Sequence, residues 1–77
     1  MSVVGVVDIF RQVLKDKNIH TNSDFFTAGG DSLLATRVLS AIAKEFGVEL
    51  TFVEFLNTPS PAGLAKHIEK RMGGGVS

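Results

Sequence analysis

Apolar side chains recur at three- and four-residue spacings in three stretches of this chain: residues 3–15, 32–47 and 61–72. Because an α-helix turns once every ~3.6 residues, such spacings gather apolar residues on one face and polar residues on the other. The apolar positions are Val3, Val6, Val7, Phe10, Val13 and Leu14, then Ala35, Val38, Leu39, Ile42 and Phe46, then Leu64, Ala65, Ile68 and Met72. The pattern predicts three amphipathic helices that share a core.

Two predicted helices have clear end signals. Asp31 precedes the second stretch and can cap the free N–H groups of its first turn, while Gly47 follows it where a left-handed residue commonly ends a helix. Thr51 and Glu54 have the spacing of a capping box, which predicts a further, short helix. That helix should end shortly before Pro59, because proline disfavours a helical conformation of the residue before it.

Ser60 and Pro61 form an N-cap and first-turn pair, so they predict the start of the last helix. No run of residues alternates as a half-buried strand does. The predicted fold class is therefore all-α, a small four-helix bundle of three main helices and one short helix with a long first loop. Residues 1–77 are expected to form a single domain whose core covers about residues 3–72, with a flexible glycine-rich tail at residues 73–77.

Residues 18–31 show no helical period and form the long first loop. Turn- and cap-forming residues fill its middle, and Gly29-Gly30 interrupts any regular element. A loop of this length in so small a domain is more often functional than not. Ile19, Phe25 and Phe26 are the apolar residues expected to pin the loop onto the core.

Composition narrows the function classes. Eight basic residues balance eight acidic ones without a basic cluster, so nucleic acid is not an expected partner. The apolar start, residues 1–7, is too short for a membrane span and has no basic flank, so no membrane contact is expected and the cytoplasm is the default location. The chain has no cysteine, so thiol chemistry would require an attached sulfur. His20 and His67 are not placed as a pair of ligands, and no metal site is expected.

The candidate chemistry lies in Gly29-Gly30-Asp31-Ser32, where the loop meets the second helix. The glycines let the backbone approach a bound group closely, and Ser32 falls on a first turn whose free N–H groups and dipole favour an anion. A phosphodiester on the Ser32 hydroxyl would therefore lie in a favourable place. Taken alone, these residues also fit a plain Gly-Gly turn followed by an Asp/Ser helix cap, so they leave both interpretations open.

A wider pattern points to one family. The chain resembles the peptidyl carrier (thiolation) domains of nonribosomal peptide synthetases in residues 24–26 (Asp-Phe-Phe) and residues 29–37 (Gly-Gly-Asp-Ser-Leu-Leu-Ala-Thr-Arg). The resemblance continues through residues 46–50, the Phe55 segment, residues 58–59 and residues 62–65. It spans roughly residues 3–71 in the expected order and spacing.

This resemblance implies a four-helix domain, like an acyl carrier protein, with no catalytic residue of its own. In that family a phosphopantetheinyl transferase moves 4′-phosphopantetheine from coenzyme A onto the serine of a Gly-Gly-x-Ser motif. Here that serine is Ser32, with Gly30 and Asp31 beside it at the cofactor site. The thiol of the arm then holds an aminoacyl or peptidyl group as a thioester. The implied partners of this monomeric carrier are the transferase, an adenylation or other loading enzyme, and condensation, thioesterase or tailoring enzymes.

The resemblance also implies a partner-facing surface on the helix that begins at the modified serine and on the short helix after it. Leu33 projects from the polar face of its helix next to Ser32, which makes it a candidate contact. Arg37 lies on the same face and can steer partners, although it fits ordinary solvated charge equally well. Val53 is a weaker candidate, since a short helix can turn this side chain inward.

Acyl carrier proteins of fatty-acid or polyketide type are the nearest alternative, because they also place Asp-Ser-Leu at such a junction. Fatty-acid carriers are typically strongly acidic, with glutamates along the serine helix. This chain is neutral, and its serine helix has Arg37 and Lys44 against the single Glu45. Together with the Gly29-Gly30 pair and Phe25-Phe26, that balance favours the peptidyl type.

Two further classes share part of the motif. GDSL esterases contain Gly-Asp-Ser-Leu, but they need a larger α/β fold and an Asp-x-x-His pair. Lys17 and Leu64 occupy the positions three before His20 and His67, so that pair is absent. The remote alternative is an unmodified helical interaction module in which Ser32 only caps its helix.

Overall fold

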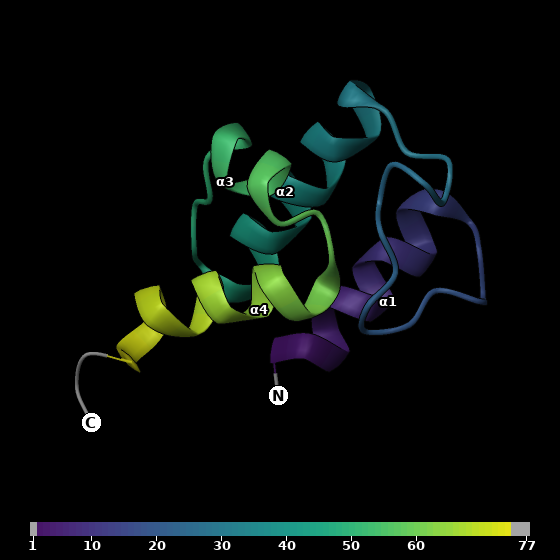
Figure 1. The fold of residues 1–77 in the computed structure, drawn as a ribbon. Coiled ribbons are helices and arrows are strands. Elements are labelled where there is room, and N and C mark those ends of the chain that lie inside the picture. The colour runs from purple at the N-terminus through teal and green to yellow at the C-terminus, as the bar shows by residue number, and fades with distance from the viewer. Residues whose placement is uncertain (1, 75–77) are drawn as a thin grey trace.

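The structure, a computed structural model, describes residues 2–74, which contain four α-helices and a C-terminal π-helix joined by loops. The helices are α1 (Ser2–Leu14), α2 (Ser32–Phe46), α3 (Phe52–Asn57) and α4 (Pro61–Glu69), and α4 runs directly into the π-helix η1 (Lys70–Gly74) (Figure 1). No strand occurs in residues 2–74. The predicted all-α fold, with three main helices, one short helix and a long first loop, is confirmed.

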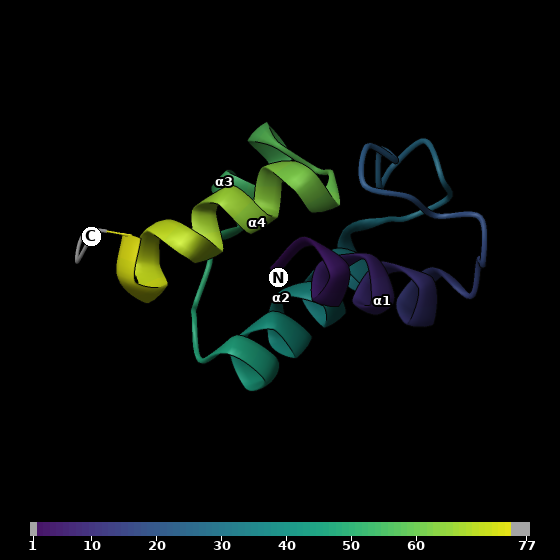
Figure 2. The same cartoon turned by 90° about the horizontal axis from the view of Figure 1, so that it is seen from below.

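Helix α1 packs against both α4 and α2, so it joins the two other long elements. The molecule measures 36 × 21 × 21 Å along its principal axes. The loop between α1 and α2 lies at one end of the long direction and η1 lies at the other (Figures 1 and 2). Within the described residues, no helix combines the length and apolar character that crossing a membrane requires.

Three phenylalanines from three different segments meet in the core. Phe10 comes from α1, Phe25 from the first loop and Phe55 from α3, and all three are fully buried. The Phe25 ring lies edge-on to the other two, with ring centroids 5.2 Å from Phe10 and 5.0 Å from Phe55. Aromatic pairs favour this geometry. These contacts fasten the first loop and the short helix α3 to α1.

The loop residues do not all turn inward. Ile19 and Phe25 are buried as predicted, but Phe26 keeps 36% of its surface exposed. Phe26 follows Phe25 in the same turn, and Phe25 takes the inward position. The Phe26 ring therefore lies edge-on against the Phe25 and Phe55 rings from outside, at centroid distances of 5.4 and 5.9 Å. The prediction that Phe26 packs within the core is wrong.

The predicted apolar faces supply most of the remaining core. The buried apolar side chains besides the three phenylalanines are Val6, Val7, Ile9, Ile19, Ala35, Val38, Ile42, Val48, Leu50, Leu64, Ala65 and Ile68. The hydrophobic pattern did not assign Ile9 to the inner face of α1, which is broader than a strict three- and four-residue stripe.

The C-terminal end of the last helix departs from the pattern. Met72 was expected to extend the inner stripe of Leu64 and Ile68, but it is 56% exposed. Helix α4 ends at Glu69, and the π-helix η1 has more residues per turn than an α-helix. The spacing that places Leu64 and Ile68 on one face therefore does not continue to Met72. Of the predicted flexible tail, residues 73 and 74 belong to η1 and residues 75–77 lie outside the described part.

The predicted helix ends are present. The Asp31 carboxylate accepts a 2.9 Å hydrogen bond from the Leu34 N–H at the start of α2, and Gly47 ends that helix in the left-handed region with φ of 69°. The Ser60 hydroxyl caps α4 by accepting a 3.2 Å bond from the Gly63 N–H. The first residue of α2, Ser32, is therefore held at a fixed position by its cap.

Candidate functional site

Ser32 is the first residue of α2, and its side chain is exposed. Its hydroxyl forms no hydrogen bond within residues 2–74, while its carbonyl accepts a 3.0 Å bond from the Thr36 hydroxyl. The Asp31 carboxylate accepts a hydrogen bond from the Leu34 N–H. The N–H groups of Ser32 and Leu33 donate to no acceptor in the described residues. The helix start thus presents a free hydroxyl beside two free N–H groups, which favour an anion.

At Gly30, two residues before Ser32, the backbone packs directly against the buried Phe25 ring. The Gly30 N–H donates a 2.9 Å hydrogen bond to the Phe25 carbonyl. A Cβ added at Gly30 would lie 2.7 Å from Cζ of Phe25 and closer still to two other carbons of the same ring. Because the Phe25 ring is buried between other rings, it cannot move aside easily. Only glycine lets the backbone approach Phe25 this closely.

Gly29 is required for a different reason. It has φ of 104°, in a region that residues with a Cβ rarely adopt, and the space where a side chain would lie is open. Its N–H donates a 3.2 Å bond to the Phe26 carbonyl, which closes the turn. The two adjacent glycines thus meet two separate demands, a turn at Gly29 and a close approach at Gly30.

Hydrogen bonds hold this loop to the rest of the molecule. The Asp24 carboxylate accepts a 2.8 Å bond from the Thr27 N–H, and its carbonyl accepts a 3.0 Å bond from the Ala28 N–H. The Phe25 N–H donates a 2.8 Å bond to the carbonyl of Pro59, between α3 and α4. The loop that carries the serine is therefore fixed both internally and to the connection after α3.

The three predicted partner-facing residues all lie on the surface. Leu33 is 65% exposed and Val53 is 64% exposed, while Arg37 is exposed on the outer side of α2. Val53 therefore points outward, whereas the sequence had left an inward orientation open. Two exposed apolar residues of α3, Phe52 and Leu56, were not predicted. No sequence signal separated them from core positions, since Phe52 lies three residues before the buried Phe55 and so shares a side of the helix with it.

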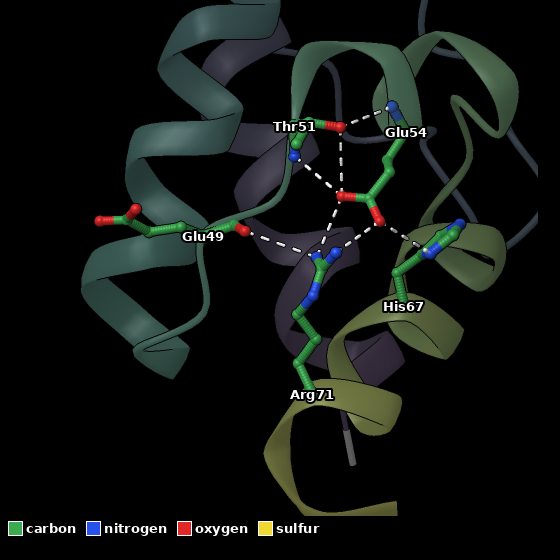
Figure 3. Close-up of polar contacts among 5 residues, drawn as sticks. All are labelled: Glu49, Thr51, Glu54, His67 and Arg71. Carbon is green, nitrogen blue, oxygen red and sulfur yellow. Dashed lines mark hydrogen bonds and ion pairs between the residues drawn. The ribbon is translucent and has the colours of Figure 1, made fainter.

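A polar cluster fixes the start of α3 (Figure 3). The Glu54 carboxylate accepts bonds of 3.0 and 2.7 Å from the two terminal nitrogens of Arg71 and a 2.9 Å bond from the Thr51 N–H. The bonds from Arg71 and Thr51, together with the guanidinium charge, lower the pKa of Glu54 from 4.5 to about 2. His67 Nδ1 lies 3.7 Å from the same carboxylate. Sequence reasoning found the capping box but not its partner Arg71.

The described residues give Ser32 no catalytic base. Neither histidine is hydrogen-bonded to Ser32 there: His20 accepts a 3.2 Å bond from the Asn22 N–H, and His67 lies beside Glu54. Residues 2–74 hold no group of three or more His, Cys, Asp or Glu side chains placed to bind a metal ion. The hydrolase interpretation thus lacks both its base and its α/β fold in this part of the chain.

The four-helix fold and the exposed serine at a capped helix start are those of a helical carrier domain. The chain belongs to the family described as "Phosphopantetheine attachment site", whose model matches residues 5–68. This membership weighs against the unmodified interaction module.

Curated relatives include much larger synthetases and synthases, one of them named as a nonribosomal peptide synthase. Pyochelin synthetase PchE of Pseudomonas aeruginosa is 42% identical over 65 residues, which is 84% of this chain and 4% of that protein. The dimodular nonribosomal peptide synthase of Bacillus subtilis is 39% identical over 62 residues, 80% of this chain and 3% of that protein. Gramicidin S synthase 2 of Brevibacillus brevis is 40% identical over 63 residues, 82% of this chain and 1% of that protein. The chain thus spans only a few per cent of these relatives.

Two solved structures share the fold. One holds the phosphopantetheine transferase Sfp in complex with coenzyme A and a peptidyl carrier protein, and this chain matches it with a TM-score of 0.89 and 27% identity over 92% of both chains. The other is the solution structure of an active-site mutant peptidyl carrier protein, with a TM-score of 0.90 and 26% identity over 94% of this chain and 80% of that one. The chain is thus a phosphopantetheine attachment domain of the peptidyl carrier type.

The cofactor that this family carries is 4′-phosphopantetheine, derived from coenzyme A. The residues at the start of α2 fit the phosphate end of that group. The Ser32 hydroxyl is exposed and free to form an ester, and the neighbouring N–H groups of Ser32 and Leu33 can donate hydrogen bonds to phosphate oxygens. The Asp31 carboxylate is engaged by the Leu34 N–H.

Proposed function

We propose that the chain is a peptidyl or aminoacyl carrier that holds its cargo on a 4′-phosphopantetheine arm attached to Ser32, in nonribosomal peptide or related natural-product biosynthesis. The observation that carries this proposal is the free, exposed Ser32 hydroxyl at the start of α2, inside the stretch that the family model matches. The arm supplies the thiol that this cysteine-free chain lacks, and the thiol holds the cargo as a thioester.

In this proposal the protein's own residues prepare the acceptor. The Ser32 oxygen would form the new bond to the phosphorus on the pantetheine side of coenzyme A. The pyrophosphate bond would break with adenosine bisphosphate as the leaving group, and a base of the transferase would take the serine proton. Asp31 keeps the first turn of α2 in place through Leu34, and Gly30 fixes the approach of the chain over Phe25. The free N–H groups at the helix start favour the resulting phosphodiester charge.

We further propose that the domain leaves catalysis to its partners. The support is the absence of a hydrogen-bonded base at Ser32 within residues 2–74 and the peptidyl carrier protein bound to a transferase in the similar structure. The partners proposed are a phosphopantetheinyl transferase, an adenylation or other loading enzyme, and condensation, thioesterase or tailoring enzymes. The chain would serve them as a single, monomeric domain in the cytoplasm, where coenzyme A is available.

The proposed docking surface lies beside the arm. Leu33 and Val53 expose most of their apolar area on α2 and α3, and Arg37 adds a positive charge on α2. Exposed apolar side chains become strong contacts when a partner buries them, because the hydrophobic effect scales with buried area. The expected contribution of Arg37 is to the rate of association rather than to affinity.

Intact-mass measurement tests the attachment. The folded chain is incubated with coenzyme A and a broad-specificity phosphopantetheinyl transferase, alongside Ser32→Ala and the control Ser40→Ala, which removes another exposed serine of α2. We expect one phosphopantetheine on the wild type and on the control, and none on Ser32→Ala. No mass gain on the wild type, or an equal gain on Ser32→Ala, would refute the proposal.

A further inference from the structure

Helix α3 depends on its neighbours for its position. It has only six residues, and helices this short are unstable on their own in water. Phe55 is its one buried residue, while Phe52, Val53 and Leu56 are exposed apolar side chains. The helix that presents Val53 of the proposed docking surface is therefore fixed to the core through a single buried residue.

The Arg71 guanidinium adds a second hold at the start of α3. Its two terminal nitrogens donate bonds of 3.0 and 2.7 Å to the two oxygens of Glu54, in the paired geometry that gives such bonds direction as well as strength. One of these nitrogens also lies 3.4 Å from the Glu49 carbonyl, in the segment before α3. Figure 3 shows the arginine reaching from the C-terminal segment to both sites.

The same carboxylate is part of the helix cap. Glu54 accepts a 2.9 Å bond from the Thr51 N–H, and the Thr51 hydroxyl accepts a 3.1 Å bond from the Glu54 N–H. Arg71 thus contacts the group that starts the helix rather than a side chain at its edge. A motion of α3 away from η1 therefore has to break the paired bonds between Glu54 and Arg71.

Arg71 lies beyond the stretch that the family model matches. The family model matches residues 5–68, whereas Arg71 lies in η1, which covers Lys70–Gly74. Arg71 is 17 residues from Glu54 and 22 from Glu49 along the chain, so this contact joins the last described element to the middle of the domain. The contact therefore brings a residue beyond the matched stretch to the start of α3.

We propose that Arg71 is a positioning residue for partner docking: through Glu54 it holds α3 in the orientation that a phosphopantetheinyl transferase recognises. The proposal rests on the proposed carrier function, since the transferase is the partner that would bind the surface formed by α2 and α3. It makes the C-terminal segment a determinant of docking, although the hydrogen bonds of Arg71 within residues 2–74 go to Glu49 and Glu54 and not to Ser32.

Three variants of the full chain test this role. Arg71→Gln removes the charge and the paired bonds, and Arg71→Lys keeps the charge but cannot bond both carboxylate oxygens in the same way. Lys70→Gln is the matched control, because Lys70 is an exposed neighbour in η1 and takes no part in the cluster at Glu54. Mass spectrometry measures the rate of amide hydrogen exchange in each variant. The rate of modification by the transferase is measured as a function of carrier concentration.

We expect the α3 amides of Arg71→Gln to exchange about two- to fivefold faster, as for loss of a surface ion pair, with the amides of α1 and α2 unchanged. The KM for the carrier should rise, by a smaller factor than the exchange rate, with kcat unchanged, because the docking-competent fraction falls. Arg71→Lys should recover part of both effects, and Lys70→Gln should behave as wild type.

Suppose that the wild type is modified at Ser32, so that the carrier function stands. The inference is then overturned if α3 exchange in Arg71→Gln is unchanged, or if exchange is faster but the KM is unchanged. A KM that rises equally in Lys70→Gln also overturns it, since the effect would then follow charge alone. A wild type that is never modified refutes the proposed function instead.

Discussion

The contact between Gly30 and the Phe25 ring predicts a large effect from one methyl group. In Gly30→Ala the new Cβ would lie 2.7 Å from Cζ of Phe25 and closer to two other ring carbons, well inside normal contact distance. The ring cannot retreat, because it packs edge-on against Phe10, Phe26 and Phe55. Either the ring cluster or the loop leading to Ser32 must therefore shift.

Overpacking of this kind lowers the free energy of unfolding by about 1–3 kcal/mol. For a chain of 77 residues, ~4–8 °C of melting temperature corresponds to each kcal/mol, so Gly30→Ala should melt roughly 8–16 °C lower for a mid-range loss of about 2 kcal/mol. Gly29→Ala should also destabilise, by about 1–3 kcal/mol, but through its backbone conformation, since a side chain there has open space.

Thermal unfolding followed by circular dichroism separates the two causes. Phe25→Leu makes room in the ring cluster, so Gly30→Ala should be less destabilising in that background, with a favourable coupling of about 0.5–3 kcal/mol. Gly29→Ala should show no such coupling, because its strain does not involve the ring. Additive effects of Gly30→Ala and Phe25→Leu, or a Gly30→Ala that melts as the wild type does, would refute the steric explanation.

Three further predictions concern the surface and the α3 region. Leu33→Ala should slow modification by the transferase yet change stability by less than about 0.5 kcal/mol, whereas buried Ile42→Ala should lose about 2–5 kcal/mol; a large loss of stability in Leu33→Ala would contradict its surface role. Because Arg71, Thr51 and the facing His67 surround a Glu54 whose pKa falls from 4.5 to about 2, its stabilising effect is complete above pH 4.5 and is lost as the pH falls through about 2. The free energy of unfolding of Glu54→Gln, measured against pH, should therefore be lower than that of the wild type at neutral pH and equal to it near pH 2. A difference between the two proteins that does not change with pH would contradict this. Thr58→Val should raise the free energy of unfolding by about 1 kcal/mol, since the buried Thr58 hydroxyl has no hydrogen-bond partner among the described residues; equal or lower stability in chemical denaturation would count against it.

The features predicted correctly from the sequence are those that local chemistry specifies. Asp31 and Gly47 bound α2, and Thr51 with Glu54 starts α3, because each cap depends on residues within one helical turn. The apolar spacing identified the inner faces of the long helices for the same reason. Local rules were therefore enough to predict the fold class, both ends of α2, and the starts of α3 and α4.

The errors arose where a residue's environment depends on distant parts of the chain. Met72 turns outward because the last helix changes to a π-helix, which no local residue pattern signalled. Phe25 and Phe26 compete for one inward position, and the rings of Phe10 and Phe55 decide which of them is buried. The Arg71–Glu54 pair joins segments 17 residues apart, so no helical period relates them.

At the candidate site, the sequence motif and the structure contribute different knowledge. The residues from Gly29 to Ser32 were compatible with an ordinary helix cap, and the family resemblance suggested the attachment role. The structure explains why two glycines precede the cap, through the φ of Gly29 and the contact of Gly30 with Phe25. It also shows that the Ser32 hydroxyl and two backbone N–H groups at the helix start are free within residues 2–74.

The most direct test of the account is the position of the arm. After reaction with coenzyme A and a phosphopantetheinyl transferase, trypsin, which cuts after lysine and arginine, releases residues 18–37 as one peptide that contains Ser23 and Ser32. Tandem mass spectrometry of this peptide should locate a single phosphopantetheine on Ser32. A group on Ser23, a group on a serine of another peptide, or a wild-type chain without any modification would contradict the central claim.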